Sequence, residues 1–225
     1  MDRIYRRQRH IYDFTRKYYL LGRDRLIDGL DLKPNARVLE VGCGTARNLI
    51  RIAKRRPDAR LYGLDASSQM LVAAEHALAG YPRVKLVRAY AEDLSPSLFG
   101  ETEAFDVILF SYSLSMIPDW KAALRAASAA LAPHGSLNIV DFGDLKGLAP
   151  LAESLLRAWL GLFHVAPRDE LLAALERDFG SQDGLVLLPG RYAFTLSCKA
   201  EKLQSKSFKT VAPESHSPSN YMILH

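Results

Sequence analysis

The chain has 225 residues, of which 48% are hydrophobic and 24% charged, with a formal net charge of +5. This balance predicts one globular domain and excludes a fibrous or wholly disordered chain, and no apolar run reaches the roughly 18–20 residues of a membrane span. The two cysteines exclude a disulfide framework, and the scattered histidines show no zinc or iron spacing, so no metal site is predicted.

The first thirty residues predict a basic, aromatic helical cap. Apolar and aromatic pairs recur every seven or eight residues, as in "IY", "IY", "YY" and "LI", which places them on one stripe of a helix that ends before Pro34. Residues 1–25 hold eight basic against three acidic side chains. Such an excess indicates an anionic partner, either nucleic acid or a membrane surface, although a solvated helix face remains the alternative.

From Arg37 onward, strand-like and helix-like segments alternate. The strand-like runs are rich in Val, Ile and Leu without alternation, which is typical of strands buried on both faces of a parallel sheet. We therefore expect an α/β fold with a doubly wound, Rossmann-like, mostly parallel sheet and helices on both faces. The predicted strands are residues 37–41, 59–65, 84–92, 105–113 and 135–142, and the predicted helices are 45–56, 67–78 and 119–131.

Two more helices, at 148–163 and 167–180, are followed by a strand pair around Pro189 and Gly190. This pair predicts an antiparallel hairpin that completes a sheet of about seven strands. From Glu201 the chain is rich in Lys, Ser and Pro with little apolar periodicity, which predicts disorder. The predicted organisation is a cap at 1–30, one domain at 31–200 and a tail at 201–225.

The stretch "VLEVGCGTARNL" predicts a strand, a glycine loop and a helix. Gly42 and Gly44 permit a tight turn close to a ligand. A dinucleotide loop would need a third glycine where this chain has Arg47, and the acidic Glu40 would repel a diphosphate. Asp65 ends the next strand, about twenty residues further on, where a carboxylate binds ribose hydroxyls. The loop therefore favours a ligand with a cationic group and an unphosphorylated ribose.

These motifs resemble a known family. "VLEVGCGTARN" and "GLDASSQML" are similar to consecutive signatures of class I S-adenosylmethionine-dependent methyltransferases, and the resemblance covers residues 35–143. It implies S-adenosylmethionine as cofactor, with the methionyl part beside the glycine loop, the ribose on the carboxylate after the second strand, and the adenine between the two following segments. The implied cofactor-binding residues are Glu40, Gly42, Cys43, Gly44, Asp65, Ala66, Met70, Ala91, Glu92 and Ser111.

The sequence lacks motifs that several classes of methyl acceptor require, and this reduces the number of possible acceptors. The segment "FSYSLSM" has no proline pair of the kind used to methylate a base amine, and neither Cys43 nor Cys198 is placed as a nucleophile. No carboxylate cluster for Mg²⁺ is present. Methylation of an unprotonated amine asks mainly for alignment and exclusion of water, and aromatic faces stabilise a quaternary ammonium product.

Candidate catalytic residues follow from this chemistry. Tyr18, Tyr19 and Tyr112 are predicted to present aromatic faces to the cation, although packing on the core is an alternative for each. Asp141, at the end of the fifth strand, and His164 are candidates for steering the amine or accepting its proton.

The segment "YRRQRHIYDFTRKYYLLGRDRLI", residues 4–27, resembles the N-terminus of bacterial betaine-lipid N-methyltransferases. The resemblance implies trimethylation of diacylglyceryl-homoserine to diacylglyceryl-trimethylhomoserine, with membrane binding through the basic helix. We therefore expect a cytoplasmic enzyme, peripheral at the inner face of the membrane, with nucleic acid disfavoured as partner. Phosphatidylethanolamine or a small amine as acceptor, and a non-catalytic module that binds RNA or anionic lipid, remain alternatives.

Overall fold

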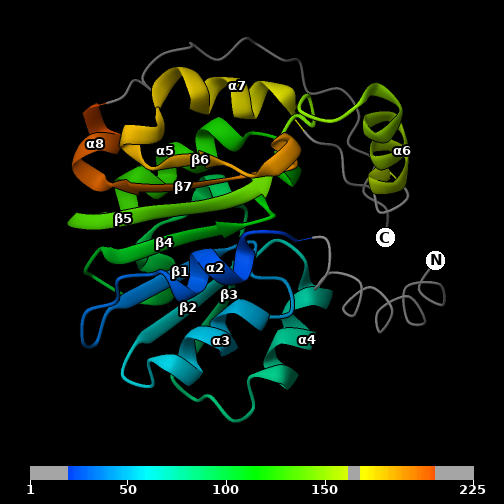
Figure 1. Ribbon diagram of the computed structural model, residues 1–225. Coiled ribbons are helices and arrows are strands. Elements are labelled where there is room, and N and C mark those ends of the chain that lie inside the picture. The colour runs from blue at the N-terminus through cyan, green and yellow to red at the C-terminus, as the bar shows by residue number, and fades with distance from the viewer. Residues whose placement is uncertain (1–19, 162–167, 206–225) are drawn as a thin grey trace, which may run out of the picture.

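The computed structural model describes residues 20–161 and 168–205 and shows a three-layer α/β arrangement (Figure 1). One sheet of seven strands has the order β3-β2-β1-β4-β5-β7-β6. The strands are β1 (Arg37–Val41), β2 (Arg60–Asp65), β3 (Val84–Arg88), β4 (Phe105–Ser111), β5 (Leu131–Phe142), β6 (Leu185–Leu187) and β7 (Ala193–Lys199).

The predicted sheet is confirmed, including its antiparallel end. Strands β1 to β5 run parallel, whereas β7 is antiparallel to both β5 and β6. From β1 the chain builds outward through β2 to β3 and then returns to place β4 on the other side of β1. The junction between β1 and β4 is thus the switch point of the sheet, where α/β folds hold ligands beyond the carboxyl ends of the strands.

Helices cover both faces of the sheet because β1 and β2 direct alternate side chains into two separate cores. Val38 and Leu61 pack with helices α2, α3 and α4, whereas Leu39 and Tyr62 belong to the core shared with α5, α7 and α8. The helices are α2 (Arg23–Asp28), α3 (Arg47–Arg55), α4 (Ser68–Ala77), α5 (Trp120–Ala130), α6 (Pro150–Gly161), α7 (Asp169–Asp178) and α8 (Ala200–Ser205).

Helix α2 is fixed to α3 by packing and by ion pairs. Ile27 is almost fully buried, and Asp28 pairs with Arg51 at 2.6 Å and with Arg55 at 3.1 Å. The end of the predicted cap therefore belongs to the body of the domain. Residues 1–19, which make up most of that cap, lie outside the described residues.

Several predicted boundaries were wrong, among them the end of the third strand and the start of the disordered tail. β3 ends at Arg88 rather than continuing to residue 92, because the chain turns into a short 3₁₀ helix at Ala91–Asp93. Disorder from Glu201 is also wrong for the first residues of the tail, since α8 runs to Ser205 and buries Leu203 against the core. Among the described residues, none of the helices has the length and apolar character needed to cross a bilayer.

Candidate functional site: a cavity at the switch point

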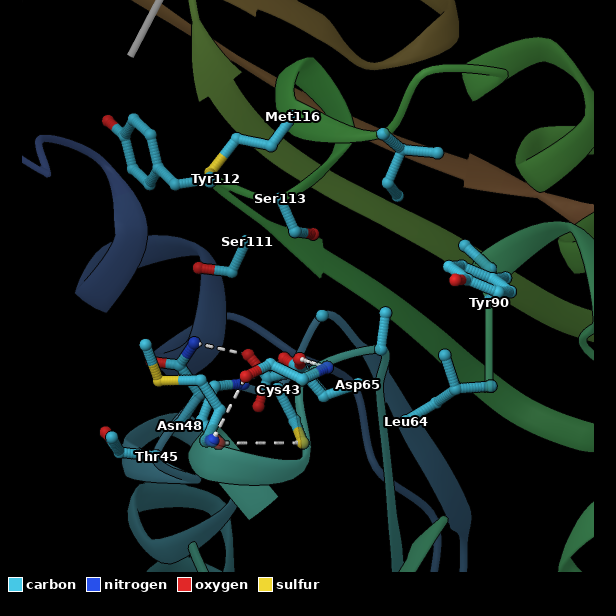
Figure 2. A pocket seen from close by; sticks show the side chains of 18 of the residues that line it. Cys43, Thr45, Asn48, Leu64, Asp65, Tyr90, Ser111, Tyr112, Ser113 and Met116 are labelled. Atoms are coloured by element: carbon cyan, nitrogen blue, oxygen red, sulfur yellow. Dashed lines mark hydrogen bonds between the residues drawn. The ribbon is translucent and has the colours of Figure 1, made fainter. Parts of the chain in front are cut away.

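A cavity of about 390 Å³ lies at the carboxyl ends of β1, β2 and β4. Figure 2 shows side chains from the β1 loop, from the end of β2 and from the segment after β4 pointing toward one another across it. This volume is within the range of sites for small molecules, about 300–1,000 Å³. The position is the one that the strand order of the sheet predicts.

The glycine loop after β1 is locked between its neighbouring strands. The backbone N–H of Gly42 donates to the carbonyl of Leu64 at 2.7 Å, and Ser113 Oγ donates to the carbonyl of Val41 at 2.7 Å. Gly42 has a φ of 71°, and a Cβ there would lie 2.5 Å from Ser113 Cβ. Only glycine therefore fits this position, for reasons of both conformation and space.

Asp65 joins the loop to the start of α4. Its Oδ2 accepts from the backbone N–H of Gly44 at 2.8 Å, and its Oδ1 accepts from the N–H of Ser67 at 2.9 Å. An ionised carboxylate has about four acceptor positions, so two remain for a ligand. A ribose diol is the part of a nucleoside that such a carboxylate binds.

Glu40 is a buried acid with one oxygen unused. The side chain is 1% exposed; Oε1 accepts from Asn48 Nδ2 at 2.6 Å. Oε2 has no hydrogen-bond partner among the described residues. Burial raises the pKa of this carboxyl to about 8. A cation bound next to Oε2 would restore the ionised form and supply the missing partner.

The unpaired buried atoms gather at this cavity. Within residues 20–161 and 168–205, the buried side-chain oxygens without a partner are Glu40 Oε2 and Ser111 Oγ. Both residues line the cavity. Since buried polar groups in folded proteins are almost always hydrogen-bonded, two such atoms on one cavity indicate a polar ligand between them. An amino-acid head group attached to a nucleoside fits these donors and acceptors.

The other predicted cofactor residues also line the cavity. Met70 belongs to the first turn of α4, where its N–H is capped by Ser67 Oγ at 3.3 Å, and Tyr90 stands at the mouth with 64% of its surface exposed. All ten residues assigned to the cofactor are brought together here, namely Glu40, Gly42, Cys43, Gly44, Asp65, Ala66, Met70, Ala91, Glu92 and Ser111.

Cys43 lines the cavity, but its thiol is not activated. Burial raises the pKa of this thiol, and the nearby carboxyls of Glu40 and Asp65 raise it further. A neutral thiol is a weak nucleophile. The residue therefore serves as wall and packing, consistent with the close approach of its sulfur to Gly63.

The predicted catalytic residues, unlike the predicted cofactor residues, are not brought together at the cavity. Tyr112 lines the cavity, but its hydroxyl donates to the carbonyl of Leu21 at 2.5 Å, and its ring contacts Phe142 edge-on. Packing, the alternative weighed for this tyrosine, accounts for these contacts. Tyr18, Tyr19 and His164 lie outside the described residues.

The role predicted for Asp141 is wrong. The side chain is fully buried and does not line the cavity. Its oxygens accept from the N–H and Oγ of Ser115, at 2.9 and 2.7 Å, and from the N–H of Phe142 at 2.8 Å. Asp141 therefore fixes the turn after β4 and does not face a substrate.

Sequence reasoning missed several lining residues, including Arg23, Asn48 and Met116. Asn48 lies in the quoted signature, and its spacing of eight residues from Glu40, across a strand, a loop and one helical turn, was a usable signal. Arg23 was hidden among the other basic residues of the N-terminal segment. Nothing in its immediate sequence separates it from the exposed arginines.

Comparisons with known proteins identify the domain around the cavity. Residues 39–137 match a family model described as a methyltransferase domain. This part of the chain is therefore similar to methyltransferase domains. S-adenosylmethionine is the methyl donor of many such domains, and the cavity at the end of β1 and β2 has donors and acceptors that fit this cofactor.

A relative from Staphylococcus carnosus, named demethylmenaquinone methyltransferase, is 32% identical over 114 residues, covering 50% of this chain and 46% of that protein. The chain thus spans about half the length of the curated relatives it matches. Among solved structures, the S-adenosylmethionine-dependent methyltransferase SibL aligns with a TM-score of 0.61 at 24% identity over 84% of this chain and 57% of that chain. A methyltransferase from Aquifex aeolicus gives 0.56 at 17% identity over 82% and 93%. These two structures support the methyltransferase fold.

Proposed function

We propose that the chain is an S-adenosylmethionine-dependent methyltransferase whose cofactor occupies the cavity at the switch point. The observation that carries this proposal is the pair of unpartnered buried oxygens, on Glu40 and Ser111, in a cavity that also holds the carboxylate of Asp65. When bound, S-adenosylmethionine supplies an electrophilic methyl group on a sulfonium.

The protein's own residues bind, orient and exclude water. The carboxylate of Glu40 would receive the cofactor's ammonium, Asp65 would receive its ribose hydroxyls, and Ala66, Met70 and Ile117, which also line the cavity, would give the apolar surface for adenine. The described lining contains no histidine. An acceptor that arrives as a free amine suits such a site, because its lone pair needs alignment rather than deprotonation during the transfer.

For the acceptor, we propose the amine of diacylglyceryl-homoserine, methylated up to the trimethyl betaine lipid. Support comes from residues 4–27, which resemble the N-terminus of betaine-lipid N-methyltransferases, and from the basic character of that segment. A basic segment suits an enzyme that collects its substrate from an anionic membrane. The cavity mouth offers exposed apolar side chains, Met116 and Tyr90, along which a lipid head group can enter.

A second candidate acceptor is demethylmenaquinone, which appears in the names of relatives from Staphylococcus and Corynebacterium. What favours it is identity of about one third, 32% over 114 residues and 31% over 136 residues. These matches cover only 50% and 58% of this chain, which limits what they say about its acceptor.

The test measures binding of the methyl donor and methyl transfer to the acceptor in separate experiments. Calorimetry with S-adenosylmethionine is expected to show one binding site, lost in the double variant Asp65→Ala, Glu40→Ala. Methyl transfer is then followed by mass spectrometry on four acceptors in mixed micelles, namely diacylglyceryl-homoserine, phosphatidylethanolamine, demethylmenaquinone and free homoserine. Mono-, di- and trimethylated homoserine lipid is the expected result.

Products on demethylmenaquinone alone would replace the lipid-amine proposal by the second candidate. Products on phosphatidylethanolamine or homoserine alone would keep amine methylation and change the substrate. Absence of cofactor binding would overturn the proposal as a whole.

A further inference from the structure

The outer edge of the sheet at β6 is open and carries no charged side chain. β6 is the last strand of the sheet and pairs with β7 alone among the described strands. Its sequence, "LVL", is wholly aliphatic. The opposite edge strand, β3, reads "VKLVR" and contains Lys85 and Arg88. Charged side chains commonly protect a sheet edge against pairing with another strand. β6 lacks this protection, so it is the edge at which a further strand can bind.

The hydrogen-bond pattern of β6 turns backbone groups toward this open edge. The N–H of Leu188 donates to the carbonyl of Ala193 at 2.8 Å. Because bonded and non-bonded pairs alternate along an antiparallel ladder, Leu187 and Leu185 direct their backbone groups away from β7. Leu185 shows this directly, since its N–H donates to the carbonyl of Gly180 at 3.2 Å. The carbonyl of Leu185 and both backbone groups of Leu187 therefore lie on the open edge.

A pocket of about 420 Å³ lies beside this edge, between β6 and the end of α7 (Figure 1). This edge pocket is lined by Glu176, Phe179, Gly180, Ser181, Leu185, Val186 and Leu187. Val186 is 56% exposed. Since β6 has only three residues, an added strand would gain few backbone bonds and would need apolar contacts as well. An edge with a pocket for side chains is the arrangement by which extended peptides are added to a sheet.

The last described helix lies next to the edge pocket. Lys202, in the last turn of α8, donates to the carbonyl of Gln182 at 3.4 Å and to Asp183 Oδ1 at 3.0 Å. Those two residues form part of the 3₁₀ turn that leads from α7 into β6. Residues 206–225 therefore continue from a point close to the open edge.

One short segment beyond α8 suits this edge. Residues 221–224, "YMIL", are an uncharged run that begins with an aromatic side chain and includes a β-branched one, both of which strands favour. The 15 residues of 206–220 separate them from α8. A linker of this length spans up to roughly 50 Å and holds the segment at an effective concentration on the order of millimolar. This tether favours residues 221–224 over a free partner.

We propose that residues 221–224 bind the open edge of β6 as an additional strand, with their backbone paired to Leu185 and Leu187 and their apolar side chains in the edge pocket. Residues 206–220, which are rich in Lys, Ser and Pro, then serve as the linker. The added strand covers the unprotected edge and keeps two copies of the chain from pairing through β6. This contact involves neither the cofactor nor the methyl acceptor, so it stands or falls independently of the proposed function.

The test follows hydrogen exchange at the amide of Leu187 in the full chain. In the wild type this N–H is expected to be protected, because the added strand accepts its hydrogen bond. Ile223→Asp should speed the exchange by about tenfold or more, since a charge opposes binding in an apolar pocket and an open edge exposes the amide to water. The amide of Val186, which pairs with Thr195 of β7, should stay equally protected in both proteins.

The matched control is Thr210→Asp, which adds the same charge beyond α8 but outside residues 221–224. Exchange at Leu187 should then equal that of the wild type. Neither substitution touches the described domain, and thermal unfolding of the three proteins checks that each remains folded.

Sedimentation at the same protein concentrations gives the oligomeric state. Protection at Leu187 that is lost in Ile223→Asp alone, in a monomer, supports the proposal. Protection that appears in all three proteins only where dimers form would show that a second copy occupies the edge, and the proposal would be overturned. It would also be overturned by free exchange at Leu187 in the wild type, or by equal protection in monomers of the wild type and Ile223→Asp.

Discussion

The two acids of the cavity have opposite environments, and this difference suits two different tasks. Asp65 accepts hydrogen bonds from the backbone N–H groups of Gly44 and Ser67. Glu40 is buried with one amide partner and one free oxygen, and its pKa is raised to about 8. Asp65 can thus accept hydrogen bonds from hydroxyl groups, whereas Glu40 becomes fully charged only when a cation binds beside it.

Replacing Asp65 tests its assigned role. Asp65→Ala should lower the affinity for S-adenosylmethionine by about ten- to a hundredfold, because hydrogen bonds to a charged acceptor are worth about 1.5–3 kcal/mol. Asp65→Asn, which keeps one side-chain oxygen as acceptor, should show a smaller loss. Calorimetry measures both affinities. Equal affinity of the wild type and Asp65→Ala would refute the assignment.

Replacing Glu40 should change how stability depends on pH. In the folded protein the carboxyl keeps its proton up to about pH 8, whereas in the unfolded chain it loses it near 4.5. Between these values the folded state binds more protons, so raising the pH lowers the free energy of unfolding, by up to roughly 1 kcal/mol per pH unit from this group. Glu40→Gln removes that contribution.

The measurement is urea unfolding without cofactor at pH 5.5 and 7.5. The wild type should lose more stability over this interval than Glu40→Gln does, and saturating S-adenosylmethionine should narrow the difference, because its ammonium favours the ionised carboxylate. Parallel losses in the two proteins would show that Glu40 is already ionised in the empty cavity.

The donor side of this site could be predicted from the sequence, whereas the acceptor side could not. Glu40, Gly42 and Asp65 lie at or directly after the carboxyl ends of two strands, and adjacent parallel strands bring these ends together. Asp141 also ends a strand, yet its carboxylate points into the turn that it stabilises, toward Ser115. Position along the chain identifies the edge of the sheet; it does not give the direction of a side chain or the burial of Arg23.

At the scale of elements, the loop between β1 and α3 depends on two glycines in different ways. Both have positive φ, 71° at Gly42 and 52° at Gly44, but a Cβ at Gly42 would meet Ser113, whereas one at Gly44 would meet nothing within 4 Å. Gly42→Ala should therefore destabilise the fold by several kcal/mol and abolish cofactor binding, through a clash in addition to the left-handed conformation.

In Gly44→Ala the added Cβ meets no neighbour, so the only cost is that of the left-handed backbone conformation, about 1–2 kcal/mol. It should fold, with a modest loss of thermal stability, and bind the cofactor weakly because its methyl group stands at the cavity wall. Thermal unfolding and calorimetry on both variants make the comparison. Similar melting temperatures for the two would show that the loop moves away from Ser113 easily.

Element boundaries followed the sequence wherever local signals were strong. β1 begins and ends where predicted, and α4, capped by Ser67, lies within the predicted helix 67–78. The error at α8 has a tertiary cause. α8 lacks the long apolar stripe of an independent helix, and it is stabilised instead by Ala200 and Leu203 packing into a core formed mainly by α5, α7 and β5. Such tertiary stabilisation of a short segment cannot be seen in its own sequence.

At the scale of the whole molecule, the two halves of the sheet differ in what they support: one half builds the cavity and the other carries a packed core. The half from β1 to β3 builds the donor cavity with α2, α3 and α4, and the half from β5 to β6 carries α7 and α8 on the opposite core. Residues 1–19 precede α2 closely in the sequence, and α2 contributes Arg23 to the cavity wall. A membrane contact made by residues 1–19 would therefore bring the cavity close to the lipid surface.

Deleting residues 1–19 tests this arrangement, because the deletion removes six basic and two acidic side chains but leaves Arg23 and α2 in place. The shortened protein should keep its affinity for S-adenosylmethionine. Under the lipid proposal, its turnover on vesicles with anionic lipid should fall at least tenfold, by loss of about 1 kcal/mol per basic residue near the surface. A variant with the six basic residues changed to Gln serves as the control for charge. Raising the salt concentration should reproduce the defect of that variant in the intact chain.

Undiminished turnover of the deletion on vesicles would mean that the segment does not recruit the enzyme, and the lipid acceptor would then lose its main support.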